Sequence, residues 1–324
     1  MSRRIVICGA GFLGSNIART LARTDGGMNH LPTRIQISSR NPEKLHSSLK
    51  ATIPSSILLP PVSLDITRSD TLKKAFKDAD VIVSLVGIMH GSPEDFERIQ
   101  WKGAENVARA AKEVGAKLIH VSAIGANDSS HIAYVRTKGL AEKAVFELCP
   151  KATVIRPSLV FGPEDDFFNR FSTLSKYLPF LPVFGGGTAK YQPVYVGDIA
   201  RLVEIISRND QEVNDAVAGK IIEAGGPEVF TYREVMELVL KYNHRRRPIV
   251  SLPFAVGMLQ GAVMQRLPLN LFTVTQDQVE QLKEDSIVNP LPPASENHAS
   301  FREIVEKHSG PLSSVHDVLP TYLK

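Results

Sequence analysis

A short apolar segment near the start of the chain leads directly into a glycine-rich turn, and this feature most constrains how the sequence can fold. Residues 5–8 form an apolar run typical of a buried strand, residues 9–14 read Gly-Ala-Gly-Phe-Leu-Gly, and residues 14–22 carry apolar side chains at helical spacing. Such a turn lets the backbone approach a diphosphate, and the helix that follows offers free N–H groups and a partial positive charge. The residues expected to bind a dinucleotide are Gly9, Gly11, Phe12, Leu13 and Gly14. The alternative is a glycine-rich turn that binds no ligand.

Short apolar strands and helical patterns alternate through the first half of the chain. Strands are expected at residues 34–38, 57–64, 81–86, 117–121 and 152–155, and helices at 70–77, 96–114 and 134–148. This alternation predicts an α/β fold with a doubly wound parallel Rossmann sheet covered on both faces. After residue 155 the alternation fades, and helical patterns return only at 197–207 and 232–242. We therefore expect a nucleotide-binding Rossmann domain over residues 1–157, with the chain returning to the sheet near 190–206. Residues 158–324 are expected to form a smaller mixed lobe for a substrate or partner.

Composition excludes several classes of protein. The chain has 324 residues, of which 43% are hydrophobic and 22% charged, as in ordinary globular proteins. Two cysteines are too few for a disulfide scaffold or a structural zinc site, and no set of His, Cys and carboxylate residues has metal-ligand spacing. A net charge of +4 without a dense basic run gives no support for nucleic-acid binding. We expect no metal, no secretory signal peptide and no transmembrane span.

The end of the second expected strand indicates which nicotinamide cofactor is preferred. An acidic residue there would bind the ribose 2′-hydroxyl and repel a 2′-phosphate. This chain has Ser38, Ser39 and Arg40 instead, and an arginine offers forked donors to a phosphate. Ser39 and Arg40 therefore predict NADP(H) in preference to NAD(H), unless Arg40 is only a solvated loop residue. Asp65, after the third strand, is a candidate for contacting the adenine.

Tyr134 and Lys138 are the candidate catalytic residues. They lie four apart on an expected helix, so both side chains share one face. A nearby ammonium favours the phenolate, so the pKa of the tyrosine can fall and the hydroxyl can exchange protons. Lys138 can also hold the nicotinamide ribose.

Taken together, these segments resemble the extended or atypical branch of the short-chain dehydrogenases/reductases. The matching segments are residues 9–14, 65–66, 83–87, 121–123, 134–138, 156–162 and 192–198. Within that family the chain is similar to the NAD(P)H-binding accessory subunit of mitochondrial complex I and its bacterial and fungal relatives, one of which acts in coenzyme Q biosynthesis. The resemblance implies that Ile66, Val86, Gly87, Ser122, Lys138, Pro157 and Val160 also contact the cofactor. It further implies a mitochondrial location on the matrix side of the inner membrane, or the cytoplasm in a bacterial source.

One position departs from the family pattern. Active extended members have a Ser or Thr a few residues after the fifth strand, and here that position is Ile124. Ser122 is not the catalytic serine in that pattern, and Ser129 or Ser130 could substitute only if the loop folds back. Two hypotheses therefore stay open. The first is an NAD(P)H-dependent oxidoreductase of the respiratory or ubiquinone system, acting on a carbonyl or quinone-pathway substrate. The second is a non-catalytic accessory subunit whose bound nucleotide stabilises the fold and an interface. A sugar-nucleotide epimerase or dehydratase is a third reading, weakened by Ile124.

Residues 244–272 combine a basic cluster with an apolar stretch. Residues 244–247 read His-Arg-Arg-Arg, and residues 248–265 carry no charge. Such a segment can lie on an anionic membrane surface or dock a subunit of a respiratory or coenzyme Q synthesis complex. It can equally build the core of the C-terminal lobe.

Overall fold

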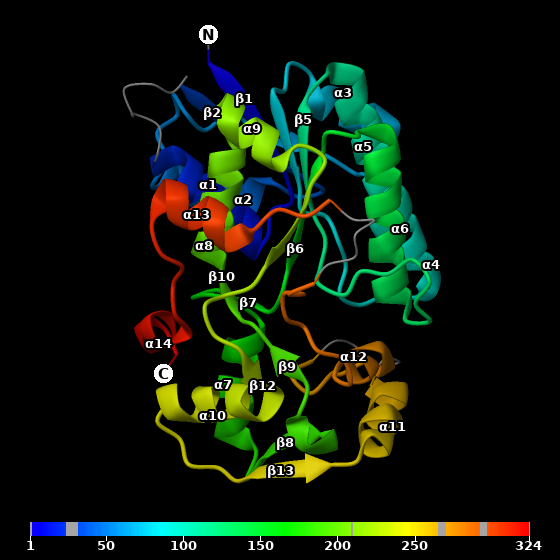
Figure 1. The fold of residues 1–324 in the computed structure, drawn as a ribbon, viewed down its shortest axis with the longest axis vertical. Coiled ribbons are helices and arrows are strands. Elements are labelled where there is room, and N and C mark those ends of the chain that lie inside the picture. The colour runs from blue at the N-terminus through cyan, green and yellow to red at the C-terminus, as the bar shows by residue number, and fades with distance from the viewer. Residues whose placement is uncertain (1, 24–31, 209, 265–269, 292–296, 324) are drawn as a thin grey trace. The chain divides into compact units, whose positions relative to one another are not determined.

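The computed structural model describes residues 2–23, 32–208, 210–264, 270–291 and 297–323 (Figure 1). Within these residues the main feature is a seven-stranded parallel sheet in the order β11-β6-β5-β4-β1-β2-β3. The strands are β1 (Arg3–Cys8), β2 (Thr33–Ser39), β3 (Val62–Ser63), β4 (Val81–Ser84), β5 (Lys117–Val121), β6 (Thr153–Pro157) and β11 (Ile221–Ala224). The predicted doubly wound α/β fold is confirmed. The strand order reverses between β1 and β4, and ligands of such sheets bind beyond the carboxyl ends of the strands at this switch point.

Helices cover both faces of the sheet (Figure 1). One face carries α1 (Phe12–Arg23) packed on α8 (Val196–Ser207), and the other carries α3 (Ser69–Phe76), α5 (Lys102–Val114) and α6 (Ala133–Leu148). The strands are buried almost throughout, since both of their faces are covered, and this explains their continuous apolar runs. Three further helices belong to this part of the chain: α2 (Glu43–Lys50), α9 (Gln211–Val217) and α13 (Phe301–Ser309).

Two expected elements differ from the structure for identifiable reasons. The third strand, expected over residues 57–64, is reduced to β3 and a single bridge between Ile35 and Leu58. Pro60 and Pro61 lie between these two pairing points, and proline has no N–H to donate to a ladder. The helix expected over 96–114 begins earlier, as α4 (Pro93–Asp95), and continues into α5 through a π-helical segment, η1 (Phe96–Trp101).

The chain divides into two compact units. The first contains Met1–Pro157, Val196–Ala224 and Asn289–Pro311, and the second contains Ser158–Tyr195, Gly225–Val288 and Leu312–Lys324. The lobe expected over residues 158–324 is therefore interrupted twice. The reason is that α8 packs on α1 and β11 pairs with β6, which brings residues 196–224 into the first unit.

The second unit is built from short strands and helices around its own apolar core. Its elements are β7 (Val160–Phe161), α7 (Phe167–Tyr177), β8 (Leu181–Phe184), η2 (Gly185–Gly187), β9 (Lys190–Tyr191), β10 (Val194–Tyr195), β12 (Phe230–Thr231), α10 (Tyr232–Tyr242), β13 (Ile249–Leu252), α11 (Phe254–Met264), α12 (Gln276–Gln281), α14 (Val315–Val318) and η3 (Leu319–Thr321). Phe161, Phe168, Met236 and Leu319 are fully buried in that core.

Candidate functional site

The glycine-rich turn after β1 has the geometry of a diphosphate cradle. Gly9 has a φ of +142°, and a Cβ added there would lie 2.9 Å from the Leu85 Cβ. A Cβ on Gly14 would lie 2.2 Å from the Gly9 carbonyl oxygen, so α1 can approach β1 this closely only with glycine at that position. A Cβ on Gly11 would meet no atom within 4 Å. Gly9 and Gly14 thus close the turn, while Gly11 borders open space.

The first turn of α1 is arranged to leave its amides available. The Phe12 carbonyl accepts from the Ser15 hydroxyl at 3.0 Å and from the Asn16 side-chain amide at 2.9 Å. The Ser15 N–H donates to the Gly11 carbonyl at 3.0 Å, and the three N–H groups before it at the start of the helix have no intrahelical acceptor. Phe12 and Leu13 are half-buried and Gly14 is buried at this helix start.

At the end of β2, Ser39 is half-buried and Arg40 is exposed. Hydrogen bonds that Asp65 accepts from Thr67 lower the pKa of its carboxyl, and the Arg40 charge adds to this lowering. The Asp65 Oδ1 receives the Thr67 N–H at 2.9 Å and the Thr67 hydroxyl at 2.7 Å. The segments expected to bind the adenosine therefore present one cationic and one anionic side chain.

Ile66 and Val86 contribute packing at the same end of the sheet. The Ile66 side chain is buried against α5, because a Cβ on Gly103 would lie 2.3 Å from its Cδ1. Only the Ile66 backbone can therefore meet a ligand. Val86 is partly buried and packs against the core, and Gly87, which follows it, is exposed.

Beyond β4 and β5 lies a buried cluster of polar side chains. Lys138 is 6% exposed, and its Nζ donates to the Val121 carbonyl at 3.2 Å. Burial lowers the pKa of Lys138 to about 8. The His120 Nδ1 lies 3.4 Å from the Ser84 hydroxyl, and burial followed by the Lys138 charge lowers the pKa of His120 to about 3. The Ser122 Oγ and the His120 Nε2 are buried without a hydrogen-bond partner among the described residues. Buried polar atoms without partners are uncommon in folded proteins, so they mark a place where a ligand or water completes the structure.

Tyr134 is the second residue of α6, one turn before Lys138, and its ring contacts Phe96 edge-on with centroids 6.1 Å apart. Burial raises the pKa of Tyr134 to about 12. Desolvation of the phenolate is the cause of this rise, and the lowering expected from Lys138 together with the positive nicotinamide of a cofactor stays a prediction. At neutral pH the Tyr134 hydroxyl is protonated and can donate a proton.

The loop after β5 does not supply the missing hydroxyl. The Ile124 N–H donates to the Pro157 carbonyl at 3.0 Å, which ties this loop to the end of β6. The Ser129 hydroxyl donates to Asp128 at 3.1 Å, and the Ser130 hydroxyl accepts from the Ile132 N–H at 3.1 Å. Both candidate serines are therefore engaged in local contacts of the loop.

Two sets of residues here were not among those expected from the sequence. Gln100, in η1, is buried and donates to the Tyr134 carbonyl and the Thr137 hydroxyl, both at 2.9 Å. Arg156 in β6 forms a buried ion pair with Glu142, which lies one turn after Lys138 on α6. For the pair of Arg156 and Glu142, the available signal was the four-residue spacing that places Lys138 and Glu142 on one helix face. No periodicity in the sequence indicated the π-helical turn that carries Gln100.

The arrangement in the first unit fits a nicotinamide dinucleotide. The Gly9–Gly14 turn borders open space at Gly11, and beyond the neighbouring strands lie the buried Lys138 Nζ and the unpaired Ser122 hydroxyl. Pro157 ends β6 on the same edge. Val160 lies in β7 of the second unit, where it pairs with Val194.

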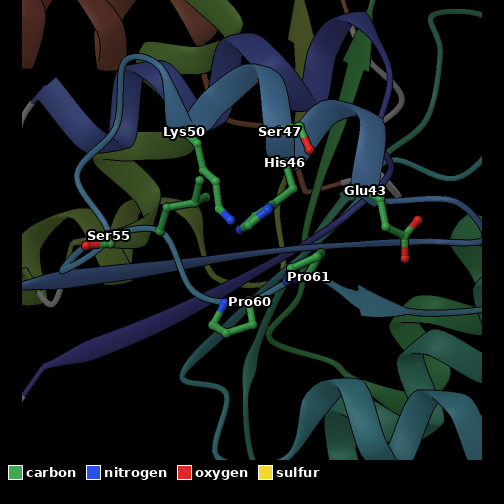
Figure 2. Close-up of a pocket in the computed structure, with 8 residues that line it drawn as sticks. Glu43, His46, Ser47, Lys50, Ser55, Pro60 and Pro61 are labelled. Carbon is green, nitrogen blue, oxygen red and sulfur yellow. The ribbon is translucent and has the colours of Figure 1, made fainter.

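A separate surface pocket of about 470 Å³ lies between α2 and the segment before β3 (Figure 2). Figure 2 shows the Lys50 and His46 side chains pointing toward the same space, opposite Pro60 and Pro61. The His46 Nε2 lies 3.0 Å from the Leu59 carbonyl. None of the residues expected to bind the nucleotide lines this pocket.

In the part of the chain that the structure describes, no three His, Cys, Asp or Glu side chains are grouped to hold a metal ion. None of the described helices combines the length and the apolar character needed to cross a bilayer.

The sheet, the glycine turn at its switch point and the polar cluster beyond β4 and β5 define a Rossmann-type protein that binds nicotinamide dinucleotides. The chain belongs to the NAD dependent epimerase/dehydratase family, whose model matches residues 5–219.

Comparison with individual proteins shows which members of this family the chain resembles. The mitochondrial NADH dehydrogenase (ubiquinone) 1 alpha subcomplex subunit 9 of Arabidopsis thaliana is 32% identical over 304 residues, covering 91% of this chain and 71% of that protein. A ceramide reductase of Caulobacter vibrioides is 30% identical over 199 residues, covering 60% of this chain and 58% of that protein. The UDP-glucuronic acid 4-epimerase of Bacillus cereus, solved with UDP-glucuronic acid and NAD, shares the fold. It has a TM-score of 0.69 and 17% identity, and the match covers 99% of this chain and 98% of that chain. The resemblance to extended short-chain dehydrogenases and to the complex I subunit group is confirmed.

Proposed function

We propose that this protein is a reductase that transfers a hydride from a reduced nicotinamide dinucleotide to a carbonyl carbon. The observation that carries the proposal is that α6 places Tyr134 one turn before Lys138, whose buried Nζ reaches the Val121 carbonyl at the end of β5 beside the unpaired Ser122 hydroxyl. A bound dihydronicotinamide would supply the hydride. The Tyr134 hydroxyl donates its proton to the carbonyl oxygen, which yields the alcohol. Lys138 holds the nicotinamide ribose, and the amides at the start of α1 hold the diphosphate. A protonated Tyr134 hydroxyl is the form that can donate the proton to the carbonyl oxygen in this reaction.

The test measures transfer of the hydride, labelled as deuterium, from the nucleotide to a ketone. The purified protein is incubated with 4-deuterated NADPH or NADH and a panel of aliphatic and aromatic ketones, and deuterium in the alcohols is measured by mass spectrometry. Wild-type protein transfers deuterium to at least one ketone class, and Tyr134→Phe transfers at least about a hundredfold less. Tyr177→Phe is the matched control, because Tyr177 is 72% exposed and should retain full activity. Nucleotide binding without deuterium transfer to any ketone would contradict the reductase proposal.

A second candidate function has its own observation. Ile124 stands where active members carry a hydroxyl, and its backbone is bound to Pro157. The Arabidopsis relative is named as a subunit of NADH dehydrogenase. An accessory subunit would use the bound nucleotide to stabilise its fold and an interface with respiratory or coenzyme Q synthesis proteins. In that role Tyr134→Phe leaves assembly unchanged, whereas a variant that loses the nucleotide does not assemble.

For the cofactor we propose a preference for NADP(H) over NAD(H). The support is that β2 ends in Ser39 and the exposed Arg40, with no carboxylate at this position to repel a 2′-phosphate. NADPH and NADH are titrated by fluorescence against wild type and Arg40→Ala. The wild type should bind NADPH about tenfold more tightly, and Arg40→Ala should lose that difference while binding NADH as before. Arg34→Ala, an exposed arginine on the same strand, is the control. Equal affinities of the wild type for both cofactors would refute the preference.

We also propose that α11 contacts an anionic membrane surface. Gly257 and Gly261 are its buried residues, while Leu259 is 69% exposed and Val256 and Val263 are exposed beside it. These three residues are therefore not part of the core. Basic residues 244–247 precede this helix by only a few residues, and their charge complements an anionic lipid surface. Residues 265–269 of the same segment lie outside the described residues.

Vesicle flotation at low salt tests this contact. Vesicles containing a fifth phosphatidylglycerol should carry the protein upward, and Leu259→Glu should abolish flotation. Leu291→Glu, at an 85% exposed leucine in the first unit, adds the same charge and should float like wild type. If the two variants floated equally, α11 would not be the segment that contacts the membrane. A place in mitochondria on the matrix side of the inner membrane is part of the same proposal, supported by the mitochondrial relative.

A further inference from the structure

The pocket between α2 and the segment before β3 shares no lining residue with the expected nucleotide site (Figure 2). Its volume of about 470 Å³ lies within the range of roughly 300–1,000 Å³ that is usual for small-molecule sites. The α2 positions that line it recur every three or four residues, so they form one face of that helix. The lining residues are Glu43, His46, Ser47 and Lys50 of α2 and, on the facing segment, Ser55, Leu58, Pro60 and Pro61.

Lys50 brings a positive charge to this pocket that no carboxylate of the described residues pairs with. Figure 2 shows its side chain pointing into the same space as that of His46. Lys50 lies in the last turn of α2, where a cation also opposes the negative end of the helix dipole. Within the described ranges, however, its Nζ has no hydrogen-bond acceptor, at the helix end or elsewhere. All of its N–H donors are therefore available to a ligand.

The His46 ring is held by one nitrogen and keeps the other for a ligand. Its Nε2 lies 3.0 Å from the Leu59 carbonyl, which can only accept, so Nε2 carries the hydrogen. The Nδ1 is then an acceptor in the neutral ring and a donor in the protonated ring. Burial, and then the Lys50 charge, lower the pKa of His46, whereas the Leu59 carbonyl and the Glu43 charge act in the opposite direction. No charged group on α1 or in residues 51–61 acts on this ring.

We propose that this pocket binds a small monocarboxylate with an apolar body, its carboxylate lying beside Lys50 and His46. A carboxylate can accept from the ammonium and from a protonated imidazole, whereas a cation would be repelled by Lys50. Leu58 and Pro60 offer apolar surface to the body of the ligand. Glu43 lies two helical turns before Lys50, roughly 10 Å along the helix axis, so its charge disfavours a second anionic group at that end. The inference does not depend on the proposed reductase activity.

Hexanoate is the probe, and its binding is measured by ligand-observed NMR at constant ionic strength. Wild type should bind hexanoate at least about tenfold more tightly than acetate, which lacks the apolar body, or hexanol, which lacks the charge. Lys50→Gln should weaken hexanoate binding about tenfold. Lys44→Gln is the matched control, because Lys44 is exposed on α2, does not line the pocket and carries the same charge. An equal effect of the two lysine variants would refute the site.

Adipate, which has a second carboxylate on a chain of the same length, tests the role of Glu43. Wild type should bind adipate more weakly than hexanoate, and Glu43→Gln should reduce that difference. Glu43 is exposed, so this variant should fold normally. Adipate binding as tightly as hexanoate to wild type would contradict the assigned orientation in the pocket.

His46 supplies a readout at the site itself. The chain has nine histidines, so NMR of isotope-labelled histidine needs one comparison spectrum, of His46→Gln, to assign the His46 signal. A bound carboxylate favours the protonated ring, so saturating hexanoate should raise the pH midpoint of His46 by at least about half a pH unit. By linkage, hexanoate should bind more tightly as the pH falls through that midpoint, while the ligand stays ionised. An unmoved midpoint at saturation would overturn the proposal.

Two further measurements exclude other sites for the probe. Saturating NADH should leave hexanoate affinity unchanged, and displacement by NADH would place hexanoate in the nucleotide site and refute the proposal. Leu259→Glu should bind hexanoate like wild type, although Leu259 is 69% exposed on α11. Binding that is lost in Leu259→Glu but kept in Lys50→Gln would place the probe on α11 and would equally refute it.

Discussion

Replacing Glu142 by glutamine tests whether a buried ion pair supports the edge of the sheet that carries the site. Arg156 and Glu142 are 8% and 6% exposed, and the guanidinium donates from Nε at 3.0 Å and from Nη2 at 2.6 Å to the two carboxylate oxygens. Glu223 in β11 is the next anion, at 3.7 Å from Arg156. Glu142→Gln keeps the volume but leaves the arginine charge only partly compensated. Breaking such a buried pair by removing one partner costs about 3–5 kcal/mol, a large share of the roughly 5–15 kcal/mol that stabilises a typical protein.

Urea unfolding measures this loss, with Trp101 as the reporter. Trp101 is the only tryptophan of the chain and lies in η1, so its fluorescence follows the first unit. Asp70→Asn is the control, because its pair with Arg68 has side chains that are 68% and 64% exposed. Removing that exposed pair should leave the urea midpoint nearly unchanged, because solvent and salt screen the two charges. A loss from Glu142→Gln no larger than that of the control would refute the claim that the buried pair stabilises this edge.

Two further predictions concern the glycine turn and a buried histidine. Gly11→Ala should fold normally and lose dinucleotide binding at least about tenfold, since the new methyl enters the open space that we expect a diphosphate to occupy. Gly14→Ala should instead lower the melting temperature sharply, because its Cβ would lie 2.2 Å from the Gly9 carbonyl oxygen. Calorimetric binding and thermal melts distinguish the two, and an unfolded Gly11→Ala would contradict the assignment. The pKa of His120 is lowered from 6.5 to about 3, so the unfolded chain binds a proton in this window that the folded chain does not. The contribution of neutral His120 to the free energy of unfolding is therefore fully present above pH 6.5. It decreases by about 1.4 kcal/mol per pH unit as the pH falls toward 3. His120→Asn should show a shallower acid dependence of the urea midpoint, and parallel curves for the two proteins would contradict the burial argument.

Local sequence patterns were sufficient to predict the strands and the first turn. Residues 5–8 and 81–84 are apolar runs because a parallel sheet buries both faces, and the glycines at 9 and 14 are dictated by contacts within one strand–turn–helix unit. Such signals need no knowledge of distant residues. The weakening of β3 was also visible in the sequence, because Pro60 and Pro61 cannot donate to a ladder.

What the sequence could not predict depends on contacts between distant segments. Nothing near Gln100 indicates that it faces Tyr134 and Thr137, because the π turn that orients it is fixed by packing of η1 against α6. The pKa of Tyr134 was expected to fall because Lys138 is four residues away. Spacing reports the distance between charges but not the loss of water around the phenol, and that loss decides the sign here.

The two shifted pKa values also determine the direction in which protons move in the proposed reaction. After Tyr134 donates its proton to the carbonyl oxygen, a phenolate remains, whose conjugate acid has a pKa of about 12 in this environment. Lys138 has a pKa of about 8, so its ammonium is a stronger acid than the Tyr134 phenol and favours the return of a proton to Tyr134. Solvent then reprotonates Lys138 near neutral pH. Alcohol oxidation runs through the same steps in reverse, so the ratio of reduced to oxidised nucleotide sets the direction of the net reaction. Exchanging Lys138 for methionine should therefore slow repeated turnover more than the first deuteride transfer, provided that nucleotide is present at saturation. Equal slowing of the first and later turnovers would show that Lys138 acts only by holding the ribose.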